Sequence, residues 1–285
     1  MGCYEQAGVD VEIQDLQSGS KALQAMIGGS TDVTSGYYDH TVQMAAKNQD
    51  VTAFVNMLRY PALVLAVAPD AAGEIDSIED LQGRTVGVTA PGSSTDFFLK
   101  HLLTQAGLPA DAASVQAIGA DATAVAAMEQ GQVDAAVMLD PSIGQLEARV
   151  GELQLLADTR TVEGVQEVYG TDTYPAAVLY ATQDYIDANT ETVDKLADAI
   201  TCALDYVQQH SGEEIAAEMP PQLVGEDTAL YARAVEALKE AYNPTGAIDQ
   251  AGAEAVRDVL AASQPEIAQA EVEVEGTYTN EYVEP

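Results

Sequence analysis

The chain has 285 residues, 47% of them hydrophobic, and 46 acidic against 11 basic side chains give it a net charge of −35. That apolar content is enough for one large domain or for two lobes with separate cores. Nucleic acid and anionic lipid both need a basic surface, so both are excluded as partners. The acids alternate with Ala, Val and Leu, so we interpret them as solvated helix faces and turns, suited to a salty medium.

Strand and helix patterns alternate through the first part of the chain. Residues 9–16 alternate apolar and polar and predict a strand, after which Ser18-Gly19-Ser20 opens a helix that ends at Gly28-Gly29. Further strands are predicted at 32–34, 52–58, 63–67, 85–89, 114–118, 133–139 and 153–157, with helices after Tyr38, at 94–106 and at 121–130. This rhythm is typical of parallel sheets with helices on both faces.

The pattern changes in the last third of the chain. A strand is predicted at 174–182, followed by helices at 190–209, 212–218, 227–241 and 249–262. At the other end, Gly8 closes a helix that has no visible beginning, so we expect the natural N-terminus to be missing. Cys3 and Cys202 make no disulfide framework; Cys202 fits a helical pattern as a small core residue, and the redox compartment is left open.

One segment of the sequence recurs. The spacing of Ala, Ala-Met, Gly and Asp in residues 22–32 returns in residues 124–134, and each copy predicts a helix, a glycine stop and a strand. Chance in an Ala-rich chain is one explanation. The other is a pair of similar α/β lobes, each presenting a loop after the repeated strand.

Catalytic and metal-binding motifs are absent from the sequence. His40, His101 and His210 are isolated, and no zinc, phosphate-loop, dinucleotide or serine-hydrolase motif occurs. We therefore predict no catalytic residue, no metal site and no cofactor, and we favour binding over catalysis.

Small hydroxyl residues follow several predicted strands, where ligands of parallel α/β sheets bind. The clearest group is Ser93, Ser94 and Thr95 after Pro91-Gly92, where free N–H groups of a helix start favour an anion or a carbonyl. The other candidates are Ser18, Gly19, Ser20, Ser35, Gly36, Tyr37 and Asp140. For Ser94 and Thr95, helix capping and ligand binding are equally good explanations. For the Ser18–Ser20 turn, Tyr37 and Asp140, an ordinary turn, core packing and capping respectively are the better explanations. Arg59 is a candidate because it is one of few cations and ends an apolar strand.

The order and spacing of several segments resemble the nitrate/sulfonate/taurine class of ABC-transporter substrate-binding proteins. These segments, besides 2–13 and 22–32, are 80–88 (DLQGRTVGV), 90–94 (APGSS), 139–141 (LDP), 174–175 (YP), 242–248 (YNPTGAI) and 279–283 (TNEYV). The resemblance covers nearly the whole chain.

The resemblance implies an α/β protein with the type II periplasmic-binding-protein fold, in which two lobes joined by a two-segment hinge close on a solute. Lobe one would comprise 1–68 and 176–285, and lobe two 69–175. The cleft would be lined by Ser18, Gly19, Ser20, Ser35, Gly36, Tyr37, Arg59, Ser93, Ser94, Thr95, Asp140 and Tyr174.

The resemblance also implies partners and a location. The solute would be a small organic or inorganic anion, passed to a membrane permease with its ATPase, and the protein would be a monomer in the periplasm or at the cell surface. Relatives begin with a strand and a helix before the segment that matches residues 2–13, and they carry an export signal; this chain shows neither.

Two rival functions use the same fold. The first is a thiamine-pyrimidine-precursor binding protein or a related pyrimidine synthase, but the synthase's Cys-rich motif and catalytic histidine are not found. The second is a sensory module, which needs a fused transmembrane segment. The longest apolar run, residues 62–68, is far shorter than the roughly 20 residues that cross a bilayer and predicts a buried strand.

The net charge of −35 generates a prediction about salt. Self-repulsion among exposed carboxylates destabilises the folded chain, and added salt screens it. The melting temperature should therefore rise by several degrees when NaCl is raised from low to molar concentration. A flat or falling curve in a thermal-shift assay would remove the salt-adaptation interpretation.

Overall fold

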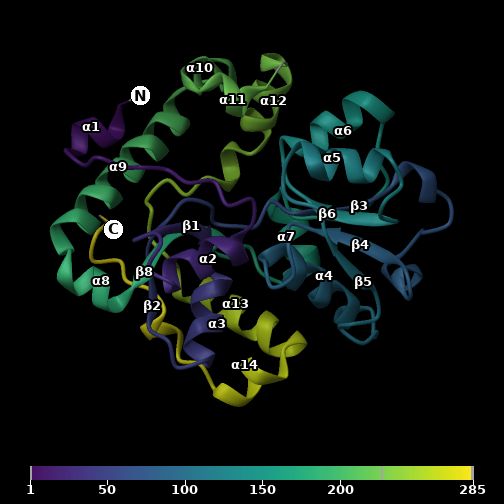
Figure 1. Ribbon diagram of the computed structural model, residues 1–285, viewed down its shortest axis with the longest axis horizontal. Coiled ribbons are helices and arrows are strands. Elements are labelled where there is room, and N and C mark those ends of the chain that lie inside the picture. Colours follow the sequence, from purple (N-terminus) through teal and green to yellow (C-terminus); the bar gives the residue numbers. More distant parts are fainter. Residues whose placement is uncertain (1, 226, 284–285) are drawn as a thin grey trace.

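The computed structural model describes residues 2–225 and 227–283 and divides into two α/β halves, each built on its own sheet (Figure 1). In the first half, the described strands lie in the order β1 (Thr34–Tyr37), β8 (Ala177–Thr182) and β2 (Val51–Asn56). In the second half the order is β5 (Ser114–Ala117), β4 (Thr85–Val88), β6 (Ala135–Met138), β3 (Val64–Val67) and β7 (Leu155–Asp158).

Helices surround both sheets (Figure 1). Those of the second half are α4 (Ser94–Gln105), α5 (Ala122–Glu129), α6 (Ser142–Val150) and α7 (Val162–Tyr169). Those before and after it in the chain are α1 (Cys3–Ala7), α2 (Gly19–Ile27), α3 (Asp39–Ala46), α8 (Gln183–Ala188), α9 (Thr190–Gln209), α10 (Gly212–Glu218), α11 (Pro221–Val224), α12 (Thr228–Ala237), α13 (Gln250–Ser263) and α14 (Pro265–Ala270). Short 3-10 turns lie at Pro69–Ala71, Ile78–Leu81, Lys239–Ala241 and Val274–Gly276. No helix in the described part of the chain is long and apolar enough to cross a membrane.

Each sheet has its own main hydrophobic core, and the first core also takes in Phe97 of α4 and Val165 of α7 from the second half. The first core includes Phe54 and Tyr180 from the sheet and Leu260 from α13. The second includes Leu65 from β3, Leu99 from α4 and Met128 from α5. All four residues of β3 are buried, as its apolar sequence predicts.

The prediction of purely parallel sheets is wrong. Strands β4–β5 and β4–β6 pair in parallel, whereas β3 and β8 pair with both of their neighbours in antiparallel fashion. Each of these two strands is the first that the chain forms after it passes from one half to the other. Because the chain enters the sheet from the other half at these points, β3 and β8 run opposite to their neighbours. Because β3 lies in the second sheet, the chain passes over before Val64 and not at residue 68.

The predicted strand at 9–16 is also wrong, because this extended segment pairs with no described strand. The two halves share an order of elements along the chain. In the second half this order is helix α4, strand β5, helix α5 and strand β6. In the first half it is helix α1, the extended segment 9–16, helix α2 and strand β1. In the second sheet β4 lies between β5 and β6. At the corresponding place in the first half, a hollow of about 700 Å³ separates residues 9–14 from β1. Without a neighbour to complete the hydrogen-bond ladder, the alternating pattern produces an extended segment and no strand.

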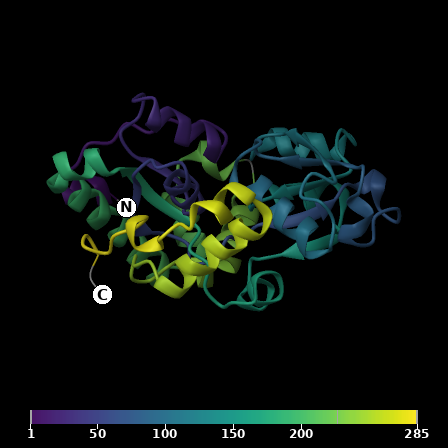
Figure 2. The same ribbon diagram turned by 90° about the horizontal axis from the view of Figure 1, so that it is seen from below.

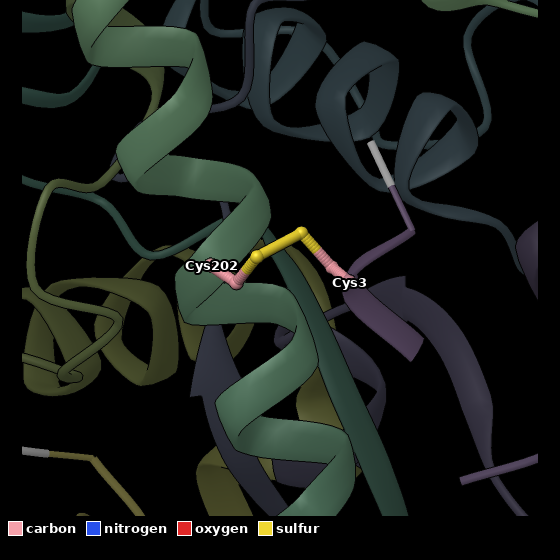
Figure 3. Close-up of a disulfide and its surroundings, with 2 residues drawn as sticks. All are labelled: Cys3 and Cys202. Carbon is pink, nitrogen blue, oxygen red and sulfur yellow. A yellow bond between two sulfur atoms is a disulfide. The ribbon is translucent and has the colours of Figure 1, made fainter. Parts of the chain in front are cut away.

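A disulfide joins Cys3 of α1 to Cys202 of α9 (Figure 3). Helix α1 packs on α9 and brings the two Cα atoms to 5.9 Å across a sequence separation of 199 residues. Cys202 is only partly buried, so its interpretation as a small core residue is wrong, and the disulfide answers the redox question that the sequence left open. Sequence could not reveal the pair because the packing of α1 on α9 is a long-range contact.

Removing this cross-link should destabilise the protein. The combined change Cys3→Ser and Cys202→Ser lifts the constraint on a very long loop in the unfolded chain, so the free energy of unfolding should fall by roughly 2–5 kcal/mol. Urea denaturation measures it, and wild type with reductant should match the variant. Two titratable thiols in the native, unreduced protein would contradict the pairing.

Candidate functional site

A groove of about 360 Å³ lies between the two halves and is lined by both. The first half contributes residues 14–19, Ala22, residues 35–37 and Ala177. The second half contributes Leu63, Thr89, residues 93–95, Ala120, Asp121 and Leu139. Figure 2 shows the two halves side by side with α13, in yellow-green, lying against the second half.

Three helices begin at this groove. Helix α2 starts after Ser18, α4 after Ser93 and α5 after Asp121. Among the hydrogen bonds of the described residues, none is donated by the backbone N–H of Ser94 or Thr95. Free N–H groups and the aligned helix dipoles give this edge of the groove a positive potential.

Side-chain charge in the groove has the opposite sign. Asp15 and Asp121 are the charged residues among those that line it, and neither Lys nor Arg occurs in that set. Asp121 caps α5 by accepting a hydrogen bond from the Thr123 N–H at 3.3 Å. A bound anion would therefore depend on helix N-termini and hydroxyl groups, not on a cationic side chain.

The two halves touch directly at one edge of the groove. The Ser20 N–H donates to Ser93 Oγ at 3.2 Å, and the two hydroxyls are also 3.2 Å apart. Ser94 Oγ donates to Asp39 Oδ1 at 2.9 Å, and His40 Nε2 lies 3.4 Å from the Gly92 carbonyl oxygen. We call these contacts the polar seam. All the seam residues except Gly92 are buried.

Most of the predicted site residues meet at this groove. Those that line it or border it are Ser18, Gly19, Ser20, Ser35, Gly36, Tyr37, Ser93, Ser94 and Thr95. Several of their side chains have local partners: Ser18 caps α2, and Thr95 Oγ1 accepts from the Thr89 N–H at 3.0 Å. The capping interpretation thus holds for Ser18, while its position still faces the groove.

Arg59 does not line the groove. Its side chain is exposed, its Nε donates to the Glu240 carbonyl oxygen at 2.7 Å, and its guanidinium lies 5.7 Å from the ring centre of Tyr60. The scarcity of cations drew attention to Arg59, but scarcity carries no information about where a side chain points.

Asp140 is also directed elsewhere. Its carboxylate forms an ion pair with Arg160 at 3.1 Å, and Asp158 pairs with the same guanidinium at 2.7 Å. These two bonds to carboxylates raise the pKa of Arg160. Asp140 precedes α6 and holds Arg160 by this ion pair. Its position after β6 in the sequence fits an ion pair and a ligand contact equally well, so the sequence could not separate the two roles.

Tyr174 lines a second, smaller cavity behind the groove. It stacks on Tyr169 with ring centres 4.1 Å apart, and the cavity also contacts Tyr37, which lines the groove. Sequence reasoning missed Asp39 in this cavity. A carboxylate directly after a strand end was a usable signal, but it was hidden among 46 acids. Across the described residues, no cluster of His, Cys, Asp and Glu could hold a metal ion.

Two of the predicted glycines have a structural reason to be glycine. A Cβ at Gly36 would lie 2.8 Å from the hydroxyl oxygen of Tyr180, which is buried in the first core. A Cβ at Gly19 would lie 2.7 Å from Cε1 of His40. Both positions allow the floor of the groove to approach the aromatic layer beneath it.

Gly36→Ala should destabilise the first half. Tyr180 is fully buried and cannot move aside freely, so overpacking should lower the free energy of unfolding by about 1–3 kcal/mol in urea denaturation. Gly276→Ala is the matched control, because nothing lies within 4 Å of its added methyl group. Equal stability of the two variants would contradict the close approach.

Comparisons with known proteins agree with this architecture. The NMT1/THI5-like family model matches residues 1–214. A solved structure from Bordetella bronchiseptica RB50 is 39% identical, with a TM-score of 0.94, and the alignment covers 99% of this chain and 88% of that one. No curated protein gives a significant match.

More distant structures share the fold. The alkanesulfonate-binding protein SsuA from Xanthomonas axonopodis pv. citri is 18% identical, with a TM-score of 0.70 over 94% of this chain and 90% of its own. A Candida albicans protein with the generic periplasmic binding protein fold is 13% identical, with a TM-score of 0.73 over 100% of this chain and 91% of its own. The chain therefore belongs to the NMT1/THI5-like family and has the periplasmic-binding-protein fold, with two lobes joined by two connecting segments.

Proposed function

We propose that this protein is the extracytoplasmic solute-binding component of an ABC-type importer and that it captures one small solute in the groove between its halves. The observation that carries the proposal is the groove itself, which residues from both halves line and which helix N-termini border. Such an arrangement lets a ligand stabilise the closed form by contacting both sides at once. The names of similar structures, among them nitrate-, sulfonate- and ABC-import-binding proteins, support it.

The solute class follows from the polarity of the groove. The starts of α2 and α4 present N–H groups and hydroxyls, which are donors suited to a sulfonate, a carboxylate or a carbonyl oxygen. We propose a small solute with one such group, held without a cationic side chain. A pyrimidine-type solute remains the second candidate because the matching family is named THI5-like and because aromatic rings lie behind the groove.

The division into lobes gives a binding mechanism. The three-stranded sheet with its helices would act as one lobe and the five-stranded sheet as the other, with the chain crossing near Pro61 and Tyr174. Closure forms the polar seam and excludes water from the groove. A permease and its ATPase would then recognise the closed form, and no chemical step on the solute is needed. We propose that the protein works as a monomer.

A thermal-shift screen of small sulfonates, carboxylates and pyrimidines, followed by calorimetry, tests the proposal. Ser93→Ala removes the hydroxyl that forms a hydrogen bond with Ser20 when the halves meet. The closed form should then be less stable, so affinity for the best solute should fall about 10-fold. Ser114→Ala, at an exposed position of β5, is the matched control and should bind as wild type does.

Arg59→Ala separates this account from one in which Arg59 binds the solute. Because Arg59 bonds to Glu240 outside the groove, the variant should keep wild-type affinity. A loss of 30-fold or more, as expected for a removed charged partner, would restore Arg59 to the site. Absence of any hit in the screen would contradict solute binding itself.

A further inference from the structure

One wall of the groove is formed by a segment that has few contacts of its own. This wall segment, residues 10–17, connects α1 to α2 without regular structure, and residues 14–17 of it line the groove. Among the described residues, no hydrogen bond joins it to another element; Asp15 accepts from the Gln17 N–H at 2.9 Å within the segment itself. None of its side chains is buried, although Val11 packs partly on the first core. Local contacts therefore do little to fix its position.

The space behind the wall segment gives it no firm support either. The hollow of about 700 Å³ separates residues 9–14 from β1, and Leu196 and Ile200 of α9 also line it. Protein segments are normally held in place by close packing against the layer beneath them. The wall segment lacks such a layer, so its position depends on how its two ends are held.

The two ends of the wall segment are anchored by different means. At α2, Ser18 accepts from the Lys21 N–H, and the next turn is fixed by Ser20, which is buried in the polar seam. At the other end, α1 is a helix of five residues, none of them buried, and the disulfide between Cys3 and Cys202 joins it to α9 (Figure 3). A helix this short has little stability of its own, so the covalent bond fixes this end.

We propose that the Cys3–Cys202 disulfide is a positioning cross-link for the solute groove, which holds residues 14–17 in the groove wall by fixing the start of the wall segment. The inference rests on the proposed function and adds to it a dependence on the oxidised cysteines. Reduction by a dithiol turns the disulfide into two thiols and the dithiol into its cyclic disulfide, and it releases the wall.

An insertion separates this positioning role from the contribution of the disulfide to stability. Gly-Ser-Gly-Ser inserted after Gly8 leaves the disulfide and the packing of α1 on α9 in place, but it slackens the connection to the wall segment. Gly8 tolerates an insertion because it is exposed and nothing lies within 4 Å of an added Cβ. The same insertion after Gly107, an exposed glycine that follows α4 and is equally open, is the matched control.

NMR relaxation reports the order of the wall segment without any solute. Its backbone amides should be ordered in wild type and in the Gly107 insertion, whereas order parameters should fall below about 0.6 in the Gly8 insertion and in the Cys3→Ser, Cys202→Ser variant. Ile267→Ala, which lowers stability from a buried position that lines neither groove nor hollow, should keep the segment ordered. If the cysteine variant does not fold, the Gly8 insertion decides. Equal order in wild type and in the Gly8 insertion would overturn the proposal.

The two acids that line the groove show whether the wall acts on a bound solute. Asp15 belongs to the wall segment and Asp121 to the second half. With propanesulfonate as the probe at low salt, Asp15→Asn should raise the affinity measured by calorimetry about 2- to 3-fold, because it removes a negative charge near an anion. In the Gly8 insertion this gain should disappear, while the gain from Asp121→Asn should persist. An equal gain from Asp15→Asn with and without the insertion would contradict a positioning role.

This inference and the proposed function fail in different ways. Binding of propanesulfonate that neither the Gly8 insertion nor its combination with Asp15→Asn alters would overturn the cross-link's role and leave solute binding intact. If neither propanesulfonate nor any compound in the screen binds, the proposed function fails. The order parameters then decide alone: a wall segment that the Gly8 insertion loosens supports the positioning cross-link, and one that it leaves ordered overturns it.

Discussion

The polar seam is the interaction on which the rest of the site depends. Ser20, Asp39 and His40 of the first half meet Gly92, Ser93 and Ser94 of the second across buried hydrogen bonds. Because these hydrogen bonds join the two halves, moving the halves apart would break them. Ser94 of the seam lines both the groove and the small cavity.

The electrostatic potential has different sources at the surface and in the groove. A net charge of −35 keeps the surface hydrated and opposes the approach of an anion from solution. In the groove, the N-termini of α2, α4 and α5 contribute a positive potential from backbone dipoles, and none of the described lining residues is Lys or Arg.

Local sequence signals predicted much of the fold and the rim of the site. The apolar run of β3, the glycine stops and the Ser-rich helix starts each depend on neighbouring residues, and the structure has strands or helices at most of the predicted places. Long-range features were out of reach. Residues 9–16 have the strand pattern but no partner, and the Cys3–Cys202 pair depends on how α1 packs. Asp39 is one of 46 acidic residues, and only its burial distinguishes it from most of the others. The structure directs Arg59 to the Glu240 carbonyl oxygen, a contact that the local sequence does not encode.

A crystal structure of the protein with the best solute from the screen tests the central claim most directly. The account predicts density for the solute in the groove, with its acceptor group within hydrogen-bond distance of the Ser94 and Thr95 N–H groups and with the Ser20–Ser93 contact formed. A solute bound outside the groove, or bound there with the halves apart and the polar seam open, would contradict it.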